Sequence, residues 1–211
     1  MLSRVESRQM TLQNRVTPFG DIVAAPYRGA LMGNRGIIHD PATRTLLKRQ
    51  WTTRAWIICV CEFKGARREV MARRSWTELF FFDEATALAA GHRPCFYCQR
   101  QRAKAFQAAW AEGSKTSIQP APAMDAALHR ERLDAKGGKR LHPIEGQIRD
   151  LPNGTMIASG QDAYVVKEEV TYLWSWQGYT PSDPPSRNVM LLTPPSTVLA
   201  LSAGYNPLVR L

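Results

Sequence analysis

Short segments rich in apolar residues recur along the first part of the chain, and this pattern predicts strands. Residues 21–23, 55–63 and 78–82 are dominated by β-branched, aromatic and other apolar side chains, which is typical of strands. Turn signals lie between them, at Gly33-Asn34 and at Lys64-Gly65. The early part of the chain is therefore expected to form a small, mostly antiparallel sheet.

Helical signals begin directly after the last of these strands. Asp83 is a good N-cap for a helix over residues 84–90, and Gly91 supplies the left-handed conformation that commonly ends a helix. Pro94 prevents the helix from resuming. A second helix is expected to run from about residue 97 to 110, because alanine and long polar side chains dominate there.

Composition divides the chain into four expected segments. A loose N-terminal arm covers residues 1–13, an α+β half covers 14–111, a linker or long loop covers 112–124, and a C-terminal half of short strands and helices covers 125–211. The expected linker is rich in glycine, serine and proline. The predicted fold class is α+β, with the sheet and two helices of the first half stapled by zinc, and the two halves can share one core.

Overall composition is that of a globular protein with a basic surface. The chain has 211 residues, of which 44% are hydrophobic and 22% are charged, and its net charge is +10. No apolar stretch approaches the roughly 18 to 20 residues that span a bilayer. We therefore expect a cytoplasmic protein without a membrane partner, and the charge predicts nucleic acid, with DNA favoured, as the partner.

Basic side chains concentrate around the cysteine-containing part of the chain. The positions expected to contact nucleic acid are Arg67, Arg68, Arg73, Arg74, Arg93, Arg100, Arg102 and Lys104. A solvated, charged surface without any partner is the alternative interpretation of the same residues.

The four cysteines form two closely spaced pairs. Cys95 and Cys98 have the Cys-x-x-Cys spacing that lets two thiolates converge on one tetrahedral ion at a helix start. Cys59 and Cys61 are alternate residues of an expected strand and would face the same side. All four are thus predicted to bind one structural zinc ion. Buried free cysteines with another residue completing the site, a redox Cys-x-x-Cys and disulfides are the alternatives.

Residues 78–98, with the sequence ELFFFDEATALAAGHRPCFYC, resemble the second half of the metal-binding domain of the Ada DNA-repair protein. That family has a strand ending in Phe-Phe, an Ala-rich helix and then Ala-Gly-Phe/Tyr-Arg-Pro-Cys-x-x-Cys. The resemblance implies four zinc-bound thiolates, one of which accepts a methyl group from DNA phosphotriesters. Cys95 and Cys98 match the family positions. Cys59 and Cys61 depart from them, because a single residue separates them where the family has three.

Together these observations predict a zinc-binding, nucleic-acid-binding protein linked to DNA processing or repair, with zinc in a structural role. Whether the protein is an enzyme stays open. One alternative is an enzyme with its active site in the C-terminal half or at the junction, around His39, His129, Glu131 or His142, and with zinc only as a scaffold. The other alternative is a zinc-stabilised protein-interaction module.

Overall fold

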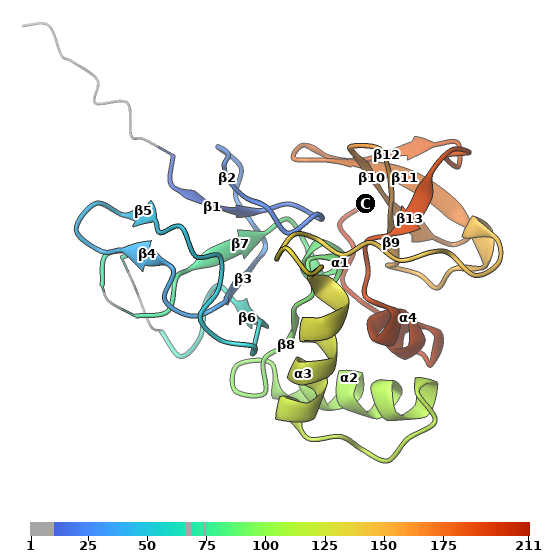
Figure 1. Cartoon of the computed structure of the whole chain (residues 1–211), viewed down its shortest axis with the longest axis horizontal. Coiled ribbons are helices and arrows are strands. Elements are labelled where there is room, and N and C mark those ends of the chain that lie inside the picture. The colour runs from blue at the N-terminus through green and yellow to red at the C-terminus, as the bar shows by residue number, and fades with distance from the viewer. Residues whose placement is uncertain (1–10, 66–68, 74) are drawn as a thin grey trace, which may run out of the picture.

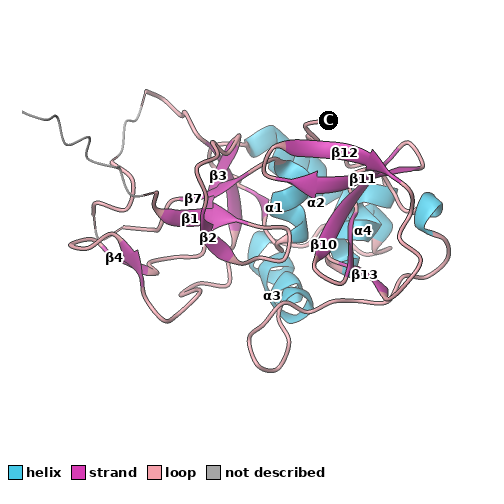
Figure 2. Cartoon of the chain, turned by 90° about the horizontal axis from the view of Figure 1, so that it is seen from above, coloured by secondary structure: helices cyan, strands magenta, loops and turns pink. Residues whose placement is uncertain are grey.

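The computed structural model describes residues 11–65, 69–73 and 75–211, and it shows a mixed α+β architecture (Figure 1). The predicted α+β class is confirmed. Two sheets lie on either side of the short helix α1, and three longer helices pack along one side of the molecule, as two perpendicular views show (Figures 1 and 2). Within the described residues, no helix is long and apolar enough to cross a bilayer.

The N-terminal half forms a six-stranded sheet. In spatial order its strands are β2 (Ile22–Ala24), β1 (Gln13–Val16), β7 (Leu79–Phe81), β3 (Leu31–Asn34), β6 (Ile57–Val60) and β8 (Arg93–Pro94). Three of its five strand pairs are antiparallel, whereas β1–β7 and β6–β8 are parallel. A separate two-stranded ribbon pairs β4 (His39–Asp40) with β5 (Thr45–Leu46).

The central strands of this sheet have two different faces. One face, which we call the core face, carries Leu31, Ile58, Leu79 and Phe81, and all four are buried in the main hydrophobic core. Gly33 lies on the same face, where an added Cβ would meet the Ile57 carbonyl oxygen at 2.2 Å, so glycine is required there. The alternate residues of the same strands form the opposite face, which we call the cysteine face because it contains Cys59.

Helix α1 (Glu84–Ala89) forms as the sequence predicts. Asp83 is its N-cap and its carboxylate accepts the Thr86 N–H at 2.8 Å, while Gly91 follows the helix with a φ of +82°. All six helical residues are buried because the helix lies between the two sheets. Leu88 packs in the main core and Ala85 packs in the second, C-terminal cluster, so α1 links the two.

Three further helices are α2 (Arg100–Gly113), α3 (Ala121–Arg132) and α4 (Pro195–Ser202). The linker expected at residues 112–124 is therefore only the connection at 114–120. The prediction took the prolines of this segment as a loop signal. Pro120 and Pro122 instead occupy the N-cap and first turn of α3, where proline is well tolerated. Helix α4 packs closely on α2, and an added Cβ at Gly113 would lie 2.2 Å from the Leu199 carbonyl oxygen.

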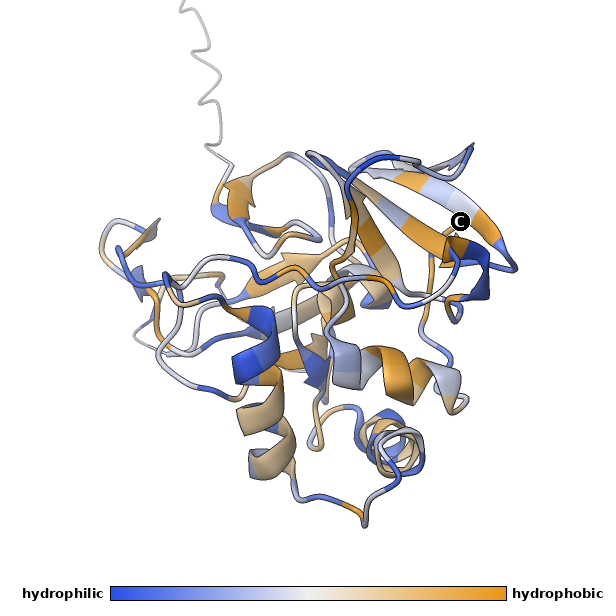
Figure 3. Ribbon diagram, turned by 45° about the vertical axis from the view of Figure 1, so that its right-hand side comes forward, coloured by the Kyte–Doolittle hydropathy of each residue, from blue (hydrophilic) through white to orange (hydrophobic). Residues whose placement is uncertain are grey.

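The C-terminal half forms a five-stranded antiparallel sheet. Its spatial order is β12 (Gly178–Ser182), β11 (Val170–Ser175), β10 (Asp162–Lys167), β9 (Met156–Ser159) and β13 (Val189–Leu191), and a short 3-10 helix, Ile148–Asp150, precedes it. Its strands show alternating hydrophobic bands (Figure 3). The main core unites Phe81 of the N-terminal half with Leu201 and Tyr205 of the C-terminal half, so the two halves share a core.

Candidate metal centre

The Cys95–Cys98 segment is a turn that joins the edge strand β8 to helix α2. The Cys95 N–H donates to the Ile58 carbonyl at 2.9 Å, which extends the pairing with β6 by one residue. Gln99, which precedes the helix, donates from its side chain to the same Ile58 carbonyl at 2.9 Å. These bonds anchor the Cys-x-x-Cys turn against the strand that carries Cys59.

Three of the four cysteines come together. The sulfur atoms of Cys59, Cys95 and Cys98 all lie within 4.8 Å of one another. Sulfurs bound tetrahedrally to one zinc ion at 2.3 Å are about 3.8 Å apart, so small side-chain adjustments suffice for coordination. Within the described parts of the chain, no other group of three His, Cys, Asp or Glu side chains gathers in this way.

Cys61, which the sequence grouped with the other three, does not join this cluster. Strand β6 ends at Val60, and Cys61 lies in a bend directly after it. Its side chain is exposed and its thiol donates to the Ala30 carbonyl at 3.5 Å. Alternate residues share a face only within a continuous strand. Because β6 ends at Val60, this rule does not apply to Cys61.

Hydrogen bonds among the three sulfurs and burial shift the pKa values of their thiols. A hydrogen bond from Cys59 to Cys95, together with backbone N–H groups of Cys98 and Tyr97, lowers the pKa of Cys95 to about 5 against the effect of burial. The same hydrogen bond and burial raise the pKa of Cys59. Burial also raises the pKa of Cys98. These hydrogen bonds favour the thiolate form of Cys95, which is the form of cysteine that binds a metal ion.

A cavity of about 420 Å³ opens beside the sulfur cluster, over the cysteine face of the sheet. Its lining includes Met32, Asn34, Ile57, Cys59, Cys61, Phe63, Trp76, Glu78, Phe80, Cys95, Tyr97 and Cys98. Asn34 and Glu78 were not singled out from the sequence as site residues. Strand alternation predicts that Glu78 shares a face with Phe80, and that Asn34 shares a face with Met32. Only the register between the strands shows that this face is the one that contains Cys59.

Arg93 does not belong to a nucleic-acid-binding surface, although the sequence suggested it. Its side chain is buried and forms a bidentate ion pair with Asp125 of α3, with nitrogen–oxygen distances of 2.8 and 2.7 Å. Because Arg93 lies in β8, this pair fixes the strand that leads into Cys95. Its guanidinium is therefore committed inside the protein and is not available to phosphate.

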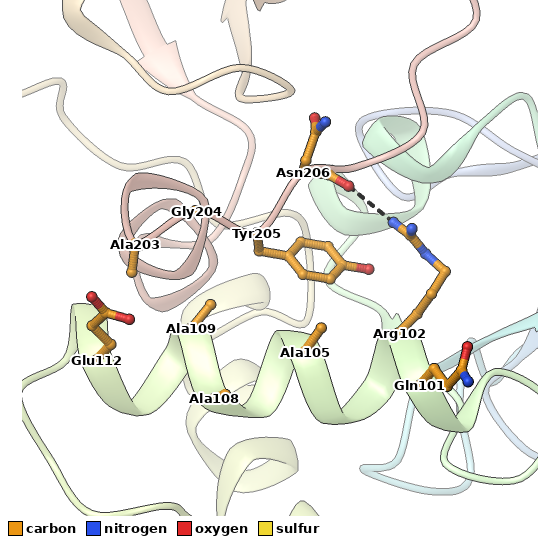
Figure 4. Close-up of a pocket in the computed structure, with 10 residues that line it drawn as sticks. All are labelled: Gln101, Arg102, Ala105, Ala108, Ala109, Glu112, Ala203, Gly204, Tyr205 and Asn206. Carbon is orange, nitrogen blue, oxygen red and sulfur yellow. Dashed lines mark hydrogen bonds between the residues drawn. The ribbon is translucent and has the colours of Figure 1, made fainter.

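The other expected nucleic-acid contacts fall into three groups. Arg67, Arg68 and Arg74 lie outside the described residues. Arg102 pairs with buried Glu84 and donates to the Asn206 carbonyl at 3.1 Å (Figure 4). Arg73, Arg100 and Lys104 are exposed.

The side chains considered for an active site in the C-terminal half or at the junction make structural hydrogen bonds. His39 is buried, and its two ring nitrogens contact the Thr77 hydroxyl and the Arg73 carbonyl at 2.7 and 2.9 Å. Glu131 accepts from the N–H and hydroxyl of Ser196 at the start of α4. His142 contacts the Glu131 carbonyl at 2.7 Å. None of these side chains lines the cavity at the cysteines.

A different set of polar side chains lies on the core side of the sheet, contributed by the end of β3 and by helix α3. Arg35 and Arg132 are buried, and their guanidinium carbons lie 3.9 Å from the ring of Trp56, to which both are directed. Arg35 also donates to His92 at 3.3 Å, and Arg132 donates to the carbonyls of Gly91 and Arg54. Burial lowers the pKa of both guanidinium groups and that of His92.

Comparison of the chain with protein-family models, with curated proteins and with solved structures gave no match in any of the three.

Proposed function

We propose that this protein binds one zinc ion through the thiolates of Cys59, Cys95 and Cys98. The observation that carries the proposal is the convergence of three sulfurs from two separate segments of the chain. Zinc is the metal that Cys-x-x-Cys thiolates in tetrahedral arrangement most commonly bind. The low pKa of Cys95 supports the proposal, because a thiolate is the metal-binding form of cysteine.

Such an ion would cross-link the sheet to the turn that leads into helix α2. Cys59 belongs to β6, whereas Cys95 and Cys98 belong to the turn between β8 and α2. Binding would therefore contribute folding free energy, since the unfolded chain has no preformed site. The fourth coordination position would face the cavity, unless Cys61 rotates away from the Ala30 carbonyl to occupy it.

Elemental analysis combined with X-ray absorption on the purified protein tests this proposal. We expect about one zinc per chain, with three sulfur neighbours at about 2.3 Å and one lighter atom. Four sulfur neighbours would support the four-cysteine site, in which zinc is purely structural. Folded protein that takes up no metal would contradict the metal site altogether.

A second candidate is binding of nucleic acid, in line with the resemblance of residues 78–98 to the Ada metal-binding domain and with a role in DNA processing or repair. The observation that favours it is the exposure of Arg100 and Lys104 at the start of α2, directly after Cys98. The net charge of +10 would add long-range attraction for a polyanion.

Fluorescence anisotropy with duplex and single-stranded oligonucleotides at roughly 50 and 200 mM salt tests the second candidate. Substituting Arg100→Gln together with Lys104→Gln should flatten the log–log salt slope for duplex DNA by up to about 2 units. The charge-matched control, Lys48→Gln with Arg49→Gln, alters two exposed residues that do not line the cavity at the cysteines and should leave the slope closer to that of the wild type. Lack of binding at the lower salt would exclude this candidate.

A further inference from the structure

The register of the N-terminal sheet brings hydrogen-bonding side chains into the same cavity as the sulfurs. One cross-strand row on the cysteine face consists of Cys59, Met32 and Phe80. The next row consists of Ile57, Asn34 and Glu78. Two ends of the cavity are thereby defined, a sulfur end on β6 and an amide–carboxylate end formed by Asn34 of β3 and by Glu78, directly before β7.

The two ends are separated by a distance that suits a small molecule. Cys59 lies on β6 and Glu78 directly precedes β7, and these two strands flank β3 on opposite sides, which places the backbones of the two residues about 10 Å apart. Glu78 is almost completely buried, and one of its carboxylate oxygens accepts the Met71 N–H at 2.9 Å. This bond holds the carboxylate group in place at its end of the cavity.

Aromatic side chains form much of the remaining wall. Phe80 comes from the sheet, Phe63 and Trp76 come from the connection between β6 and β7, and Tyr97 comes from the Cys-x-x-Cys turn. The rings of Phe63 and Tyr97 contact each other edge to face, with centroids 5.1 Å apart. A volume of about 420 Å³ with apolar walls and a few polar groups is typical of a small-molecule site.

The charge at the sulfur end restricts the class of ligand. Three thiolates more than neutralise a divalent ion, so a fourth ligand that is neutral is favoured over a second anion. A ring nitrogen meets this requirement and is a common ligand of zinc. At the other end, the Glu78 carboxylate can accept a hydrogen bond, and the Asn34 side-chain oxygen, which already accepts the Gly36 N–H at 3.2 Å, has a second lone pair. This end therefore favours a ligand with an amino group.

We propose that this cavity binds a small, flat nitrogen heterocycle, whose ring nitrogen completes the metal coordination and whose amino group donates to Glu78. The inference rests on the zinc site proposed above. The aromatic walls pack against the faces and edges of the ring, while the two polar ends determine its orientation.

The experiment uses the full chain with cobalt(II) in place of zinc, because the visible absorption of cobalt reports on the fourth ligand. The probe is 5-aminobenzimidazole, which has a ring nitrogen at one end and an amino group at the other. We expect saturable binding with a change in the cobalt absorption. The isosteric 5-aminoindole lacks the coordinating nitrogen and should leave the spectrum unchanged, and benzimidazole, which lacks the amino group, should bind more weakly.

A carboxylate variant tests the other end of the cavity. Glu78→Gln keeps the size of the side chain and its acceptor for the Met71 N–H, but it should weaken 5-aminobenzimidazole about tenfold or more through loss of a charge-assisted hydrogen bond. Its affinity for benzimidazole should change little. The control Glu145→Gln, at an exposed position, should leave both affinities unchanged.

Metal content, measured on the same samples, separates the two proposals. If cobalt binds at one ion per chain but 5-aminobenzimidazole neither binds nor alters the spectrum, the ligand site is refuted while the metal site stands. Equal affinities for 5-aminobenzimidazole in the wild type and in folded Glu78→Gln would also refute the assigned orientation. If the protein takes up no metal, both proposals fail.

Discussion

The two faces of the N-terminal sheet place polar chemistry in opposite surroundings. On the core face, Arg35 and Arg132 stack on Trp56, and backbone carbonyls and His92 receive their hydrogen bonds. On the cysteine face, the sulfurs of Cys59 and its two partners contact one another beside a cavity. Arg35 Nη2, Arg132 Nε and His92 Nδ1 have no hydrogen-bond partner among the described residues, so the two faces differ in what lies next to them. Protein encloses the cations of the core face, whereas the sulfurs of the cysteine face border a cavity with room for a ligand.

This difference shows how a buried polar cluster can be interpreted. Cations that are surrounded by a tryptophan ring and by carbonyl oxygens contribute to packing, and no cavity among those described contacts them. The thiols of the cysteine face hydrogen-bond to one another and to nearby backbone N–H groups beside an open cavity, and they would have to lose their protons to bind a metal ion. Function is accordingly expected on the cysteine face and stability on the core face.

Loss of a metal ligand should have the largest effect. Cys98→Ser is expected to abolish tight zinc binding and to lower the free energy of unfolding by about 4 kcal/mol or more, which corresponds to a fall of about 10 °C or more in Tm. Zinc analysis and thermal denaturation of the variant measure both quantities. Unchanged zinc content and an unchanged Tm would contradict the functional role assigned to the cysteine face.

Removal of a buried cation from the core face should destabilise the protein without affecting the metal. Arg132→Met keeps most of the side-chain volume but leaves the carbonyls of Gly91 and Arg54 without their donor, at a cost of about 3 kcal/mol. Chemical denaturation gives the change, and zinc content should stay at one per chain. Arg130→Met, an exposed position on the same helix, is the matched control. Concomitant loss of zinc would show that the two faces are not independent.

The two cysteines near the end of β6 should differ from each other. Cys59→Ser is expected to lose zinc, whereas Cys61→Ser should retain it and change the free energy of unfolding by less than about 1 kcal/mol, because Cys61 is exposed and makes one weak hydrogen bond. Zinc titration of both variants distinguishes them. Equal loss of zinc would instead demonstrate a site with four thiolates.

The smallest effect is a pH dependence that arises at Lys139. Its ammonium group donates to the carbonyls of Ala89 and Leu192, and burial, together with Arg35 and Arg132, lowers its pKa to about 7. The unfolded chain, with a lysine pKa of about 10.4, binds more protons in the interval between these values. The contribution of Lys139 to stability therefore rises with pH from about 7 to about 10.

Comparison of the wild type with Lys139→Met isolates this contribution from other titrating groups. The Tm of the wild type relative to that of the variant should increase as the pH rises across this interval. A difference in Tm that stays constant, or that decreases with pH, would show that Lys139 is not desolvated in the folded protein.

The sequence alone determined the local elements with strong signals. The Asp83 cap, helix α1 and its Gly91 stop were predicted correctly, because each depends on contacts within a few residues. The Cys-x-x-Cys turn is likewise local, since four residues suffice to bring two sulfurs together. The α+β class also followed from the change in periodicity along the chain.

Only the tertiary structure decided which distant residues meet. The end of β6 at Val60 separates Cys61 from Cys59, and that end depends on pairing with β3. The ion pair with Asp125 of α3 buries Arg93, which the sequence had placed at the surface, because the two residues are far apart in the chain and meet only in the folded protein. Glu78 and Asn34 meet the cysteines through strand register, which is a property of three strands that are far apart in the sequence and cannot be determined from any one of them.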